Sequence, residues 1–212
     1  MIKTRLISIA LILMLSAPLV IAQSTNKGKT SFAILGGVNF QNIDGKDYGD
    51  KLKNNLLIGF HAGFNIQIPI APEFFLQPGL LYSVKGAKST TGTITNTFKL
   101  SYIELPLNVV YKALLGKGYI MVGFGPYVAY GIGTEGSSKD VEFNDVVETN
   151  TVTYFKPLDA GANIFVGYEL VSGIFCQLNT QLGMLKINPV EVPDYKLSAK
   201  NTGFGLSIGY RF

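Results

Sequence analysis

The sequence predicts an all-β protein: an eight-stranded antiparallel up-and-down transmembrane β-barrel, with its apolar face toward lipid and a polar lumen. Three observations carry this prediction. Apolar residues alternate with small or polar ones along about eight segments. The connections between these segments are alternately short and long. The chain is 47% hydrophobic and only 15% charged, whereas a soluble protein has about a quarter charged residues.

The N-terminal residues 1–22 have the pattern of a secretory signal peptide. Lys3 and Arg5 precede the apolar run LISIALILMLSAPLVIA, which ends at the small residue Ala22. This order predicts cleavage between Ala22 and Gln23. A membrane-anchoring helix is the alternative, although the run is short for one. We therefore expect a signal peptide at 1–22 and a barrel domain at 23–212.

The net charge and the cysteine content argue against a nucleic-acid-binding protein and against a protein held together by disulfides. Removal of Lys3 and Arg5 lowers the formal charge from +4 to +2. The other basic residues are scattered, so we expect no nucleic-acid partner. Cys176 is the single cysteine, so the chain forms no internal disulfide.

Each predicted strand has one apolar and one polar face. In LLIGFHAGFNIQI at 56–68, for example, Leu, Ile, Phe and Ala alternate with Gly, His, Asn and Gln. Alternation of this kind is typical of a strand with two different environments. The predicted strands are residues 31–40, 56–68, 73–84, 98–112, 118–130, 153–169, 173–185 and 200–212.

The connections fall into two kinds that alternate along the chain. The short ones are residues 69–72, 113–117 and 170–172; the long polar ones are 41–55, 85–97, 131–152 and 186–199. Outer-membrane barrels have short periplasmic turns and long extracellular loops. With an even number of strands, both termini are then expected on the periplasmic side.

The volume of the apolar side chains indicates that they point outward. The apolar faces hold roughly forty side chains, too many for the narrow interior of an eight-stranded barrel. The other faces are rich in Gly, Asn, Gln and Ser, which suit a narrow polar lumen. A soluble β-sandwich is the alternative. Aromatic residues near the segment ends are expected to form interfacial girdles: Phe40, Phe74, Tyr82, Phe98, Tyr111, Tyr130, Tyr168, Tyr210 and Phe212.

Three consecutive stretches resemble a known family. They are PGLLYSVKGAK at 78–88, YIELPLNVVYK at 102–112 and GYIMVGFGPYVAYG at 118–131. This order resembles the PorT-like outer-membrane β-barrel proteins of Bacteroidetes, in which a Y-[IL]-E-[ILV]-P-L strand precedes a G-x-G-P-Y strand. The similarity covers residues 32–212 and implies an integral outer-membrane protein of a Gram-negative bacterium. The namesake of that group is associated with type IX secretion, but membership implies no single activity.

A few ionisable residues lie on the predicted lumen face, and a charge in a narrow barrel must be paired or hydrated. We expect them to form a polar plug; a gate or a binding site in the lumen is the alternative. Glu104 is expected to bond a lumen Arg, Lys, Tyr or Asn, with Tyr102 and Asn108 as candidates, and Arg211 to pair with Glu169 on a neighbouring strand. The residues are His61, Glu104, Asp159, Glu169 and Arg211.

An enzyme is the weaker interpretation. A lipid-modifying barrel enzyme would need a serine or water nucleophile activated by His61, the only histidine, with an acidic partner. No HxS-type cluster, HxxE, CxxC or nucleophile-elbow pattern accompanies it. We therefore expect no catalytic residue, no metal and no cofactor.

Many lysines are expected in the long loops, where they could contact lipopolysaccharide phosphates. Acidic residues in the same loops dilute any patch, so ordinary solvated charge is the favoured interpretation. Outer-membrane lipids and lipopolysaccharide are the expected surroundings, and no specific protein partner is indicated. The lysines are Lys46, Lys51, Lys53, Lys85, Lys88, Lys139, Lys186, Lys196 and Lys200.

The C-terminal segment NTGFGLSIGYRF is predicted to close the barrel by pairing with residues 31–40, because no strand edge can remain in lipid. It also resembles the C-terminal signature that the barrel-assembly machinery reads, with Tyr210 and Phe212 as the signal. The sequence thus predicts a non-enzymatic outer-membrane barrel, structural or adhesive, or accessory to an envelope assembly such as secretion. A narrow or transport-associated pore and a lipid-modifying enzyme are the alternatives.

Overall fold

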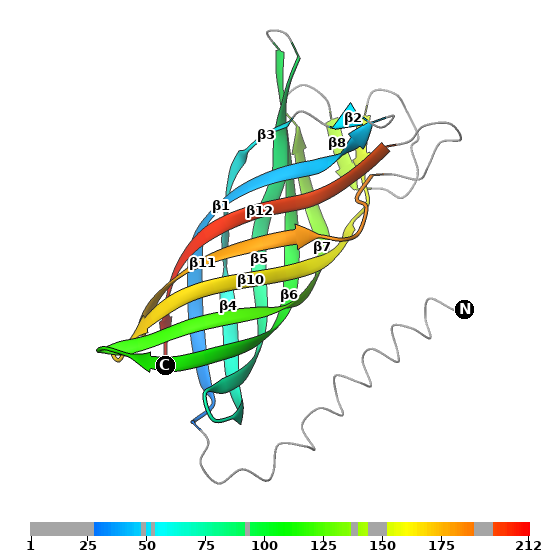
Figure 1. Cartoon of the computed structure of the whole chain (residues 1–212). Helices are drawn as coiled ribbons and strands as arrows, with labels where there is room; N and C mark the ends of the chain where they lie inside the picture. Colours follow the sequence, from blue (N-terminus) through cyan, green and yellow to red (C-terminus); the bar gives the residue numbers. More distant parts are fainter. Residues whose placement is uncertain are drawn as a thin grey trace, which may run out of the picture.

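The computed structural model describes residues 28–47, 50–51, 54–91, 94–136, 140–143, 152–188 and 197–212. The predicted signal peptide lies outside these ranges. All regular secondary structure within them is β-strand (Figure 1). None of the described residues belongs to a helix that is long and apolar enough to cross a membrane.

Eight long strands form a closed antiparallel ring, which confirms the predicted fold class. Each pairs with the next in the chain, and β12 returns to pair with β1 (Figure 1). That closing ladder runs from Ala33↔Arg211 to Asp47↔Leu197, longer than the pairing predicted for 31–40. The strands are β1 (Ser31–Asp47), β4 (Leu57–Ala71), β5 (Phe74–Thr91), β6 (Ile94–Leu115), β7 (Gly118–Gly136), β10 (Leu158–Leu170), β11 (Ile174–Gly183) and β12 (Leu197–Arg211).

Four short strands lie at the end of the barrel that carries the long connections. β2 (Asp50–Lys51) pairs with β1, and β3 (Asn54–Asn55) pairs with β5. β8 (Asp140–Phe143) and β9 (Val152–Phe155) form a separate parallel pair.

Several predicted strand ends are wrong: β1 and β7, for example, run to Asp47 and Gly136. Two further differences have a clear physical reason. Residues 85–97 were expected as a loop, but β5 and β6 continue as a hairpin from Lys85↔Leu100 to Thr91↔Ile94. The sequence KSTTGTITNT at 88–97 is almost entirely polar, so it loses the alternation that marks a strand in lipid. The predicted strand at 153–169 is interrupted at Pro157, which has no N–H for a ladder and separates β9 from β10.

The short turns join the strands at the opposite end, where the C-terminus also lies (Figure 1). Gly116 and Gly173 have φ values of 62° and 92° there, which glycine adopts without a steric penalty. The Gly173 carbonyl also accepts a hydrogen bond from the backbone N–H of Arg211 at 2.8 Å. This turn therefore fixes the end of the closing strand.

The outer wall of the barrel is apolar, as predicted from the volume argument. Phe204, Leu206 and Ile208 are exposed on β12, while Asn201 and Ser207 are buried on its inner face. Such a wall satisfies the requirement for a lipid-facing surface.

Aromatic pairs border this wall at two levels. Phe74 packs against Tyr111 near the short turns, and Phe60 packs against Tyr82 higher up, with ring centroids 5.2 and 5.6 Å apart. The eight steps along the chain from Phe74 to Tyr82 rise about 20 Å along a strand tilted as in barrels, close to the apolar band of about 25 Å. Phe98 does not belong to the predicted girdles, because it packs on a buried cluster with Phe155.

The lumen is filled in layers. On β6 the inward residues run from the apolar Val110 through Asn108 and Glu104 to Tyr102 and Leu100, all buried. The layer near the short turns is Ala33, Leu35, Val110, Met121, Phe165 and Phe175. The layer near the long connections is Ile43, Ala87, Leu100, Tyr102, Tyr127, Ala129, Phe155, Ile187 and Ala199.

Candidate functional site

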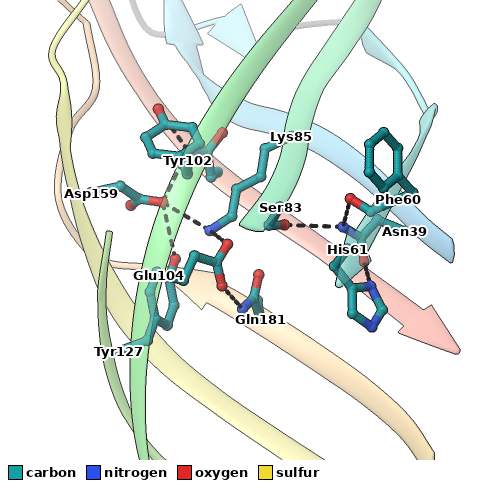
Figure 2. A network of polar contacts seen from close by, with 11 residues as sticks. Asn39, Phe60, His61, Ser83, Lys85, Tyr102, Glu104, Tyr127, Asp159 and Gln181 are labelled. Atoms are coloured by element: carbon teal, nitrogen blue, oxygen red, sulfur yellow. Dashed lines mark hydrogen bonds and ion pairs between the residues drawn. The ribbon is translucent and has the colours of Figure 1, made fainter. Parts of the chain in front are cut away.

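A buried ion cluster occupies the middle of the lumen (Figure 2). The ammonium of Lys85 on β5 lies 2.9 Å from Glu104 Oε1 on β6 and 3.1 Å from Asp159 Oδ2 on β10. The three side chains are 0–1% exposed. One cation is thus shared between two carboxylates, and their attraction offsets part of the cost of burying all three charges.

The carboxylate of Asp159 is surrounded by further donors. Asn201 Nδ2 donates to its Oδ2 at 3.0 Å, and the Tyr127 hydroxyl donates at 3.3 Å. The Tyr127 ring also lies beneath Lys85, with its centroid 4.4 Å from Nζ. Hydrogen bonds to Asp159 Oδ2 and a cation–π contact therefore replace part of the hydration that these charges lose, while the buried Asp159 Oδ1 accepts no hydrogen bond from the described residues.

The partners of Glu104 were predicted only in part. A lumen lysine does bind it, and Gln181 Nε2 donates to its other oxygen at 2.8 Å. Of the suggested neighbours, Asn108 accepts a hydrogen bond from Asn163 instead, at 2.6 Å. Tyr102 lies near Lys85, with its ring centroid 5.4 Å from the ammonium.

The assignment of Lys85 to a long loop was wrong. Strand β5 continues through this residue, and Lys85 shares the inward face with Gln77 and Ser83. The predicted strand ends at residue 84, so extending its alternation by one residue would have placed Lys85 on the lumen face with Ser83.

His61 forms a second polar group (Figure 2). Its Nδ1 lies 2.6 Å from Asn39 Oδ1, and its Nε2 lies 2.7 Å from Ser207 Oγ. The Asn39 amide nitrogen donates to Ser83 Oγ and to the Phe60 carbonyl. This assigns the amide oxygen to the histidine, so Nδ1 carries the proton and the Ser207 hydroxyl donates to Nε2.

This Ser–His–Asn chain was missed because Ser207 lies 146 residues after His61 and on another strand. No local motif could have shown it. The order of hydrogen bonds is the one used to activate a nucleophilic serine. Ser207, however, is only 1% exposed.

The third group lies at the short-turn end of the lumen. Glu169 accepts from Arg211 Nε at 2.9 Å and from Lys112 at 2.6 Å, and Arg211 also donates to Asn65. The structure thus contains the expected ion pair between Arg211 and Glu169, but the two strands are not neighbours, because β11 separates β10 from β12. The group borders a cavity of about 610 Å³ that is also lined by Gln67.

The five predicted lumen residues therefore belong to three groups rather than one. Glu104 and Asp159 meet at Lys85, Glu169 and Arg211 meet near the short turns, and His61 bonds to Asn39 and Ser207. Nowhere in the described ranges do three or more His, Cys, Asp or Glu side chains come together as metal ligands.

The sequence matches the model of a protein family described as "Outer membrane protein beta-barrel domain" over residues 21–187. The chain belongs to this outer-membrane β-barrel family. Together with the closed ring and the apolar wall, membership places the protein in the outer membrane. Comparison with curated proteins gives no match.

Two solved structures are similar to this outer-membrane barrel. One is Ail, the attachment invasion locus protein of Yersinia pestis, in complex with the heparin analogue sucrose octasulfate. The two sequences are 13% identical, the match covers 86% of this chain and 99% of that one, and the TM-score is 0.37. The other is the outer membrane protein AlkL in lipid bilayers. It is 15% identical, the match covers 90% of this chain and 94% of that one, and the TM-score is 0.37. Similarities at this level carry no argument about function.

Proposed function

We propose that the protein is a sealed, non-enzymatic outer-membrane barrel. Its role is structural or adhesive, through the long connections at one end, or accessory to an envelope assembly such as secretion. The observation that carries the proposal is the buried cluster of Lys85, Glu104 and Asp159, which lies between two apolar layers in the lumen. A solute would have to displace these packed and paired side chains in order to pass.

The proposal includes a topology. The signal peptide at 1–22 directs export, the short turns and the termini are periplasmic, and the long connections are extracellular. The sequence similarity to the PorT-like proteins of Bacteroidetes supports a Gram-negative source. Outer-membrane lipids surround the wall, and the barrel-assembly machinery recognises the last strand through Tyr210 and Phe212.

Single-channel recording in a planar bilayer tests the seal. We expect no steady conductance from the wild-type barrel. A steady open current that falls or becomes gated in Glu104→Ala would contradict the proposal and favour the narrow or transport-associated pore.

One observation favours an enzyme as the second candidate, namely the Ser207–His61–Asn39 chain. Burial argues against it, because a nucleophile must reach its substrate and Ser207 is enclosed in the lumen. We therefore assign these hydrogen bonds a structural role. A fluorophosphonate probe and the lipid-A acyl pattern check this: labelling of Ser207 that is lost in His61→Ala, or an acyl change that depends on His61, would establish the enzyme.

A further inference from the structure

A groove of about 530 Å³ lies on the outer wall of the barrel, toward the long connections. Strands β4, β5, β6 and β7 all contribute to its lining. The size is that of pockets that hold small molecules. The residues used below are Ile58, Phe60, Tyr82, Lys99, Ser101 and Glu135.

Irregular strand pairing leaves this space open. The ladder between β6 and β7 shifts at Ser101 and Tyr102, so that Ile132 has no partner. Immediately above the shift, Gly133 faces Ser101, and a Cβ added there would meet no heavy atom closer than 3.8 Å. The bulge and two small residues therefore create a hollow where larger side chains would fill the wall.

The lining changes from apolar to polar along the barrel axis. Ile58 and Phe60 are 65% and 53% exposed and continue the lipid-facing wall. Above them the Tyr82 hydroxyl donates to Ser101 Oγ at 2.9 Å, and the side chains of Lys99 and Glu135 are 41% and 70% exposed. Because Tyr82 belongs to the upper aromatic level, the groove crosses the boundary between the acyl chains and the headgroups.

We propose that this groove binds one phosphorylated glycolipid of the outer leaflet. An acyl chain lies along Ile58 and Phe60, and a phosphate accepts charge-assisted hydrogen bonds from Lys99. Lys99 now pairs with Glu135 at 2.9 Å, but both groups are exposed and such pairs are weak, so the phosphate can replace the carboxylate. The inference rests on the topology proposed above, because only then does the groove face the outer leaflet.

Native mass spectrometry of the full-length mature barrel, after reconstitution with lipopolysaccharide or with anionic phospholipid alone, measures the bound lipid. We expect one retained lipopolysaccharide molecule per barrel, and retention roughly tenfold lower in Lys99→Glu, which loses a charged hydrogen-bond donor. Gly133→Leu should lower retention by filling the groove, and Glu135→Gln should raise it by releasing Lys99. Lys117→Glu at the opposite end and Ala162→Leu elsewhere on the outer wall are the matched controls.

Unchanged retention in Lys99→Glu and Gly133→Leu, or equal losses in the two controls, would overturn the site. Preferential retention of phospholipid would overturn the choice of lipid. Heat-modifiable gel migration verifies that each variant is folded. Topology is tested separately by labelling Lys51→Cys in a Cys176→Ala background: labelling only after permeabilisation of the outer membrane would refute the proposed orientation rather than the groove.

Discussion

Replacement of Lys85 by methionine removes the only cation in contact with Glu104 and Asp159 among the described residues. Methionine keeps most of the volume, so packing changes little, but two carboxylates remain buried without a counter-charge. Breaking a buried ion pair by removing one partner costs about 3–5 kcal/mol. We expect Lys85→Met to lower the free energy of unfolding by about that amount.

Glu104→Gln is the matched control, since it keeps Lys85 paired with Asp159 at 3.1 Å and preserves the side-chain shape. Glu104→Gln should lower the free energy of unfolding by clearly less than Lys85→Met does, by about 0–2 kcal/mol, because no charge is left unpaired. In the triple variant Lys85→Met, Glu104→Gln, Asp159→Asn, all three charges are gone, and most of the loss in Lys85→Met should be recovered.

Urea titration of the refolded barrel in lipid vesicles, followed by the fraction with heat-modifiable gel migration, measures these differences. If Lys85→Met unfolds within about 0.5 kcal/mol of the wild type, the size of a neutral surface change, the cluster is hydrated rather than sealed. The same result would weaken the proposed plug.

Three further predictions concern other parts of the barrel. Deletion of Phe212 should strongly reduce outer-membrane insertion in cells, although its side chain is 69% exposed, whereas Phe212→Tyr should insert normally. If the deletion variant inserts as well as the wild type, Phe212 is a residue of the outer wall and not an assembly signal. Gly123→Val should destabilise the barrel by about 1–3 kcal/mol, because an added Cβ would lie 2.2 Å from the Phe165 ring. Adding Phe165→Ala to the same chain should recover part of this loss, and a neutral Gly123→Val would contradict tight packing in the lumen. Ile187→Ala should cost about 2–5 kcal/mol in the same urea titration, because Ile187 is fully buried in the upper layer, whereas Leu185→Ala, on an exposed neighbour, should change little.

Features that depend on neighbouring residues could be predicted from the sequence, whereas features that depend on residues far apart in the chain could not. The inward and outward faces of β4, β6, β11 and β12 follow from period-two alternation, which is a local property of an extended chain. The strand ends were misjudged wherever a strand leaves the apolar band, as in the hairpin of β5 and β6. There lipid no longer selects apolar residues on one face, and the pattern disappears although the backbone pairing continues.

The sequence by itself determined the fold class, the apolar wall and the closing strand, because lipid and a narrow lumen impose opposite requirements on neighbouring residues. Only the tertiary structure decided which lumen residues meet. Lys85 and Asp159 are 74 residues apart, and His61 and Ser207 are 146 apart. Their contacts run across the interior between strands, and they depend on the stagger that closes the ring rather than on any local spacing.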